Sequence, residues 1–156
     1  MEYFYIITNP TKDIDLKTAY FIRDYLLSKG KQCVIDAGEA KGTLEGYTDK
    51  NNVPAEVDCV IVLGGDGTML QAAVDLSDRD IPFLGINLGT LGFLAEVNVS
   101  DIENALDRLI AEEYQIENRM MLYGLSYQKD MVKDNAIAVE VGINRIDNKL
   151  YGDVNF

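Results

Sequence analysis

The sequence contains no histidine among its 156 residues. This absence excludes the Ser–His–Asp and Cys–His mechanisms and every metal site that uses an imidazole ligand. A general base in this chain must therefore be a carboxylate, a lysine or a tyrosine.

Basic residues are also scarce, with 14 lysines and arginines against 26 acidic residues and a formal net charge of −12. No basic run is present, so we expect no nucleic-acid partner, because such binding depends on neutralising phosphates. An acidic chain still binds anionic nucleotides where backbone N–H groups or Mg²⁺ supply positive charge.

Long apolar runs are missing too, and no stretch approaches the eighteen residues that a membrane span needs. The opening sequence "MEYFYIITNP" lacks the basic region and small-residue cleavage site of a secretory signal. We therefore expect a cytoplasmic protein with no membrane partner.

Cysteine is scarce as well. The two cysteines, Cys33 and Cys59, lie inside the apolar runs "QCVID" and "DCVIVL". In a cytoplasmic chain these surroundings favour small buried hydrophobic residues over a disulfide. No CxxC pair or Cys/His cluster occurs, so we expect no zinc site and no other protein-bound metal.

The remaining pattern is that of an α/β protein. Continuous apolar runs predict strands over 3–8, 32–36, 57–65 and 81–87, and helical spacing predicts helices over 15–29, 68–77 and 101–114. Ser100 and Glu103 have the spacing of a capping box for the third helix. Because the strands are apolar throughout and alternate with helices, residues 1–114 predict a doubly wound, mostly parallel, Rossmann-like sheet.

Two stretches fall outside this alternation. Residues 37–56 are polar and glycine-rich, and they predict a long loop. Residues 115–156 predict extended strands with hairpin-type breaks. We interpret 115–156 as the opening strands of a truncated, all-β second domain.

The stretch "IVLGGDGTML", residues 61–70, places three glycines and Asp66 between a predicted strand and a predicted helix. Glycines there let the backbone approach a phosphate, with a helix N-terminus behind them and Thr68 as a cap or phosphate ligand. The order fits neither the dinucleotide fingerprint nor a Walker A loop. Asp66 is either a turn former, as in many Asp–Gly pairs, or a group that meets Mg²⁺ or a substrate hydroxyl. A second glycine-rich stretch, residues 88–97, follows the next strand and is expected at the same edge of the sheet.

A family resemblance narrows these alternatives. GGDGT is shared by NAD kinases and by lipid kinases of the diacylglycerol and sphingosine type. The segment "GINLGTLGFLAEV" (85–97) resembles the NAD kinase pattern GIN-x-G-x-LGFL, which the lipid kinases lack. "IENRMMLYG" (116–124) resembles the strand that opens the second domain of bacterial NAD kinases. The chain therefore resembles the N-terminal domain of an NAD kinase with the start of its second domain.

The resemblance implies phosphorylation of the adenosine ribose 2′-hydroxyl of NAD by ATP with Mg²⁺, giving NADP. Asp66 would be the proton acceptor, and Gly67 would pack against the nicotinamide nucleotide. The adenine and ribose would be bordered by Leu91, Gly92, Phe93 and Leu94. The phosphoryl donor would bind beside Gly64, Gly65 and Thr68. Phe93 equally suits core packing, because an aromatic residue after a strand is often buried.

Two departures from the family pattern keep other interpretations open. The Asn–acidic pair that grips NAD in the family aligns with Glu140 and Val141, so Glu140 is either a surviving acidic ligand or an exposed strand residue. The family's distal glycine-rich segment is absent, so we expect the chain alone to have weak or no activity.

The resemblance implies a homo-oligomer, a dimer or tetramer, at full length. A lipid kinase domain and a degenerate, non-catalytic nucleotide-binding module remain the alternatives.

Overall fold

A computed structural model describes residues 1–36, 48–90, 92–119, 121–125 and 136–140. The chain divides into two compact units, Met1–Tyr114 and Gln115–Phe156. Each unit is described by itself.

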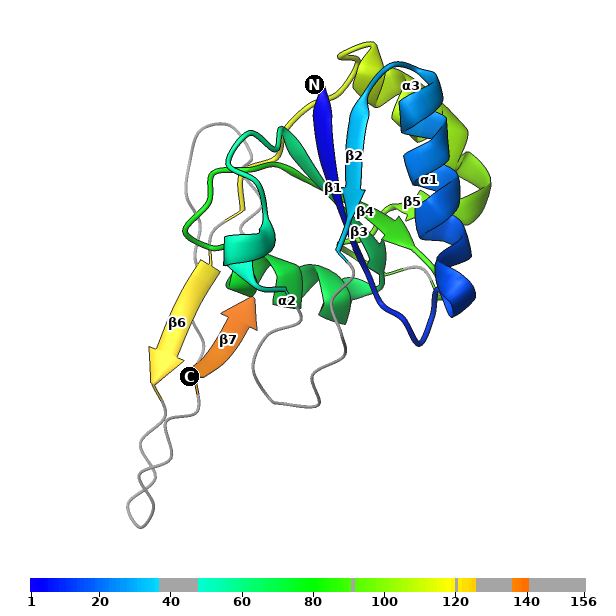
Figure 1. The fold of residues 1–156 in the computed structure, drawn as a ribbon. Coiled ribbons are helices and arrows are strands. Elements are labelled where there is room, and N and C mark those ends of the chain that lie inside the picture. The colour runs from blue at the N-terminus through cyan, green and yellow to red at the C-terminus, as the bar shows by residue number, and fades with distance from the viewer. Residues whose placement is uncertain (37–47, 91, 120, 126–135, 141–156) are drawn as a thin grey trace. The chain divides into compact units, whose positions relative to one another are not determined.

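The first unit is built on a five-stranded sheet in which every pair of neighbouring strands is parallel (Figure 1). Its strands are β1 (Tyr3–Thr8), β2 (Gln32–Ile35), β3 (Cys59–Gly64), β4 (Phe83–Asn87) and β5 (Val97–Asn98), in the order β2-β1-β3-β4-β5. The predicted mostly parallel sheet is confirmed, and β5 is an additional two-residue strand. β3 is buried over its whole length, because a central strand is covered on both faces, which explains its unbroken apolar run.

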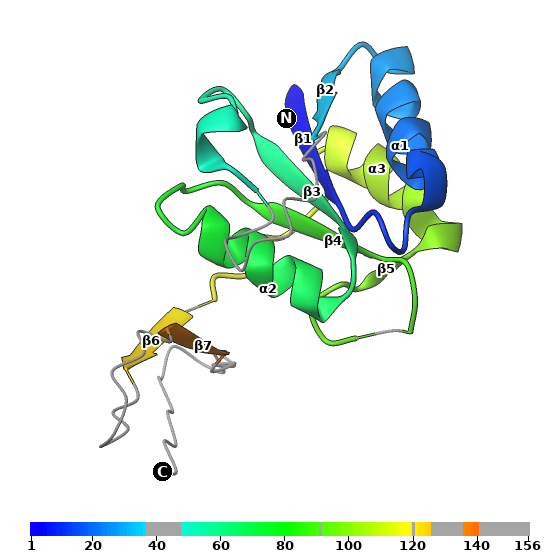
Figure 2. The ribbon, with the colours of Figure 1, turned by 60° about the horizontal axis from the view of Figure 1, so that its bottom comes forward.

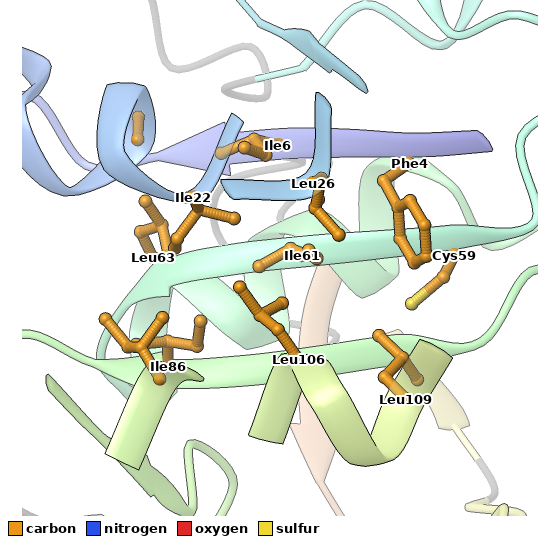
Figure 3. Close-up of a cluster of buried hydrophobic side chains, with 12 residues drawn as sticks. Phe4, Ile6, Ile22, Leu26, Cys59, Ile61, Leu63, Ile86, Leu106 and Leu109 are labelled. Carbon is orange, nitrogen blue, oxygen red and sulfur yellow. The ribbon is translucent and has the colours of Figure 1, made fainter. Parts of the chain in front are cut away.

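Helices cover the two faces of this sheet (Figures 1 and 2). α1 (Lys17–Ser28) and α3 (Ile102–Ile110) pack on one face, and α2 (Asp66–Asp75) packs on the other. Figure 3 shows the first of these cores, where Ile22 and Leu26 of α1 and Leu106 of α3 meet side chains of β1, β3 and β4. The doubly wound α/β fold is therefore confirmed.

The helix starts differ from their predicted positions. α2 begins at Asp66 with Gly65 as its N-cap, so Thr68 lies inside the first turn and is not the cap. α1 begins at Lys17 after a 3₁₀ turn, Ile14–Leu16, in which Asp15 and Leu16 have φ values of 58° and 55°. α2 therefore begins two residues earlier than predicted, and α1 begins two residues later.

The capping box at Ser100 is wrong. Residues Val99–Asp101 form a 3₁₀ turn, and Asp101 occupies the N-cap position of α3 without a side-chain cap. Ser100 Oγ instead donates to the Asp101 carboxylate at 3.4 Å. Ser100 thus lies inside the 3₁₀ turn and not at the N-cap of α3.

Residues 37–47 of the predicted loop over 37–56 lie outside the described residues, and residues 48–56 form neither an α-helix nor a strand. Lys50–Asn52 form a 3₁₀ turn whose N-cap, Asp49, accepts from Asn51 N–H at 2.9 Å. Val53 is buried against the α2 face of the sheet. Arg79 also donates to the carbonyls of Val53 and Pro54, at 3.2 and 2.8 Å, so both apolar packing and hydrogen bonds hold this segment on the core.

Both cysteines are free; Cys59 is buried and Cys33 is half-buried. Burial raises the pKa of each thiol to about 12. The expectation of unpaired cysteines is therefore confirmed, with Cys33 less buried than predicted.

In the second unit, β6 (Met121–Leu125) pairs antiparallel with β7 (Ala136–Glu140), and Glu140 stands opposite Met121. The interpretation of 115–156 as the start of an all-β domain stays a prediction. None of the helices in the described part of the chain is long and apolar enough to span a membrane.

Candidate functional site

The two glycine-rich stretches leave the sheet side by side. β3 and β4 are parallel neighbours, with Gly64 in register with Asn87. Leu88 N–H then donates to the Gly64 carbonyl at 2.8 Å, where both strands end. The predicted placement of both stretches at one carboxyl edge of the sheet is confirmed, and this edge is where parallel α/β sheets bind ligands.

Asp66 joins the two stretches. It lies in the first turn of α2, and its carboxylate accepts from the backbone N–H of Phe93 at 2.9 Å and of Leu94 at 3.0 Å. A third, longer hydrogen bond comes from Ala95 N–H at 3.4 Å. In all three hydrogen bonds the carboxylate is the acceptor and a backbone N–H is the donor. Asp66 is therefore more than a turn former, because it ties the second loop to the start of α2.

Close approach explains two of the glycines. A Cβ added to Gly92 would overlap the Asp66 carboxylate, with the Asp66 Cγ only 2.5 Å away. A Cβ added to Gly64 would overlap the Thr68 side chain, whose own Cβ would be 2.6 Å away. These glycines let both side chains lie against the backbone.

Open space surrounds two other predicted site residues. A Cβ added to Gly67 would meet none of the described residues within 4 Å. Phe93 is 90% exposed, so the interpretation of Phe93 as a core residue is wrong. A free face on α2 and an exposed ring beside Asp66 both leave room for a ligand.

The loop after β1 lies at the same carboxyl edge of the sheet. Asn9 N–H donates to the Leu63 carbonyl at 2.9 Å, and Asn9 Nδ2 donates to Thr68 Oγ1 at 3.5 Å. The Asn9 side-chain oxygen accepts from Thr11 N–H at 3.0 Å. Asn9 thereby connects its own loop to β3 and to residues 64–68, which we call the glycine turn.

Asp13 closes the same loop from the other end. It is buried, and its carboxylate accepts from the N–H groups of Thr18 and Ala19 at 2.8 and 3.0 Å and from Thr8 Oγ1 at 3.2 Å. This carboxylate satisfies free N–H groups in the first turn of α1.

Lys12 lies between Asn9 and Asp13 in the sequence, and its side chain extends to the glycine turn. Its Nζ would lie 3.0 Å from a Cβ added to Gly65 and 3.6 Å from one added to Gly89. Sequence reasoning missed this residue. The available signal was the Asn9-Pro10 turn, because the first loop of a parallel sheet ends at the same edge as the glycine turn.

The other predicted residues lie elsewhere. Leu91 lies outside the described residues, and Glu140 ends β7 in the second unit. Within the described ranges, no group of three or more His, Cys, Asp or Glu side chains is arranged to hold a metal ion. The structure therefore assembles Asp66, the glycine turn and residues 92–95 at one place.

Comparisons with known proteins agree with this geometry. A family model described as the ATP-NAD kinase N-terminal domain matches residues 4–114. An NAD kinase of Lachnospira eligens is 43% identical over 148 residues, which are 93% of this chain and 50% of that protein. An NAD kinase of Pyrococcus furiosus is 38% identical over 148 residues, which are 90% of this chain and 52% of that protein.

Among solved structures, the fold matches a crystal structure of yeast NADH kinase complexed with NADH, with a TM-score of 0.61 and 20% identity. The match covers 88% of this chain and 46% of the yeast chain. The chain thus spans about half the length of the curated relatives it matches.

Proposed function

The chain belongs to the ATP-NAD kinase family, and on that premise we propose that the full-length protein phosphorylates the adenosine ribose 2′-hydroxyl of NAD with ATP, giving NADP. The observation that carries the proposal is the Asp66 carboxylate, held by the amides of residues 93–95. It joins the GGDGT turn, which NAD kinases share with lipid kinases, to the 85–97 segment, which lipid kinases lack.

Asp66 is the proposed proton acceptor. The 2′-oxygen attacks the γ-phosphorus of ATP, the bond from that phosphorus to the β–γ bridging oxygen breaks, and ADP leaves. The hydroxyl proton passes to the Asp66 carboxylate. Phosphoryl transfer depends mostly on positioning and charge stabilisation, so a mild base suffices. The absence of histidine leaves a carboxylate as a natural choice.

The glycine turn is the proposed phosphate cradle. Gly64, Gly65 and Thr68 stand at the N-terminus of α2, where backbone N–H groups and the helix dipole favour anions. Gly67 and Phe93 have the open surroundings that a nucleotide needs. Gly92 and Leu94 lie where the second loop meets Asp66, so we propose that Leu91–Leu94 border the adenine and ribose.

We propose that Mg²⁺ enters as part of the ATP complex. The described residues supply no cluster of acidic side chains for a resident ion, and Mg²⁺ commonly takes substrate phosphates and water as ligands. From the family resemblance we also propose a cytoplasmic homo-oligomer in which Glu140 contributes to the NAD site.

The test is an assay of the full-length protein with MgATP and either NAD or diacylglycerol. We expect NADP to form, detected with an NADP-specific dehydrogenase, and no lipid phosphate. Phosphorylation of diacylglycerol alone would favour the lipid kinase. Binding of NAD without NADP formation would favour the degenerate nucleotide-binding module.

A further inference from the structure

We propose that Lys12 binds a phosphate group of the phosphoryl donor, an inference that rests on the proposed function. The strand order reverses between β1 and β3, since β2 lies beyond β1 and β4 lies beyond β3. α1, which follows β1, covers one face of the sheet, and α2, which follows β3, covers the other. Such a reversal opens a crevice between the two loops at the carboxyl edge. Lys12 lies on the first of these loops and Gly65 on the second.

The loop that carries Lys12 is held in place without a ligand. Lys12 N–H and Asp13 N–H both donate to the Asn9 carbonyl, at 3.0 and 2.9 Å. The buried Asp13 carboxylate then fixes the following residue to the start of α1. The backbone from which the Lys12 side chain extends is therefore ordered before any ligand arrives, which lowers the entropic cost of binding.

The Lys12 ammonium lies among groups that favour an anion. It stands beside Gly65, the N-cap of α2, and beside Gly89 in the loop after β4. Within the residues that the structure describes, Lys12 forms no ion pair, although the chain has 26 acidic side chains. A lysine ammonium is a compact charge with three donors, which suits phosphate oxygens.

The geometry assigns this phosphate to the donor and not to NAD. Asp66 faces residues 92–95, where the accepting ribose is proposed to lie. Lys12 approaches Gly65, which precedes Asp66 in the glycine turn, and Gly89, which precedes Gly92 in the loop after β4. A phosphoryl group in transfer lies between its acceptor and its leaving group, so the donor phosphates extend from Asp66 toward Lys12.

The experiment compares K12M, K12R and the control K17M in the full-length protein. Lys17 is an exposed lysine at the start of α1, and, unlike Lys12, it is not among the groups within 4 Å of a Cβ added to Gly65. We expect K12M to raise the KM for ATP about tenfold or more and to change the KM for NAD by less than about twofold. K12R, which keeps the charge, should recover most of the ATP affinity, and K17M should match the wild type.

An unchanged KM for ATP in K12M would overturn the inference, and so would an equal rise in the KM for NAD. If the wild-type protein forms no NADP, the proposed function fails and Lys12 is tested separately by titration with ATP and with inorganic triphosphate. Weaker binding of both by K12M, but not by K17M, would support the phosphate contact. Equal binding by both variants, or no binding by the wild type, would refute it.

Discussion

The Asp66 carboxylate accepts a hydrogen bond from the backbone N–H of Leu94 at 3.0 Å, across 28 positions of sequence. This contact holds the loop after β4 against the first turn of α2. Disturbing either partner should therefore affect both the stability of the loop and the chemistry assigned to Asp66.

Gly92→Ala tests this relationship from the loop side. The new methyl group would overlap the Asp66 carboxylate, so the loop or the side chain must shift. We expect the free energy of unfolding to fall by about 1–3 kcal/mol, measured by urea denaturation, together with a lower rate of NADP formation.

Gly67→Ala is the stability control for that experiment. Its methyl group would lie more than 4 Å from every neighbour in the part of the chain that the structure describes, and the residue lies inside α2. Alanine there should keep or raise the stability, by up to about 1 kcal/mol. Equal stabilities for Gly92→Ala and Gly67→Ala would contradict the close packing of Gly92 against Asp66.

Asp13→Ala should destabilise the protein. The substitution removes the acceptor for the N–H groups of Thr18 and Ala19 in a buried position. We expect a loss of about 1–2 kcal/mol of unfolding free energy. Asp24→Ala is the matched control, because Asp24 is exposed and pairs with Arg23 at the surface. A loss no larger than that of Asp24→Ala would show that Asp13 does not cap α1.

Asp58 should make stability depend on pH in the acid range. Backbone N–H groups of Glu2 and Tyr3 donate to its carboxylate and lower its pKa below the usual value. A lowered pKa in the folded state stabilises the protein above the unfolded value of about 3.9, and this contribution is lost as the pH falls through the folded value. Asp58→Asn should therefore be less stable than wild type at pH 7, and urea denaturation should show the difference shrinking below about pH 4. A difference that does not change with pH would contradict this account.

The sheet was predictable because its central strands carry continuous apolar runs. Residues 59–64 are buried on both faces, and burial of this kind leaves a pattern in the sequence itself. The start of α3 was not predictable in the same way. A serine three residues before a glutamate fits a capping box, but whether an extra 3₁₀ turn precedes the helix depends on packing around Val99–Asp101.

The candidate site was predictable only where its residues belong to a motif. Asp66 and residues 92–94 lie in glycine-rich stretches, and the resemblance to a family assigned them roles. Lys12 lies outside those stretches, and its approach to Gly65 depends on the order of the strands. The exposure of Phe93 was not predictable even though this residue lies in a motif. An aromatic residue after a strand looks the same in sequence whether it is buried or, like Phe93, 90% exposed.

The most direct test of the central claim is the kcat for NAD phosphorylation of Asp66→Asn in the full-length protein. Asparagine keeps a carbonyl oxygen that can accept from Leu94 N–H, but it cannot take the proton of the hydroxyl. We predict a kcat at least about 100-fold below wild type, with Asp80→Asn, an exposed aspartate past the end of α2, close to wild type. An Asp66→Asn enzyme with a kcat within about twofold of wild type would contradict the assignment of Asp66 as the proton acceptor.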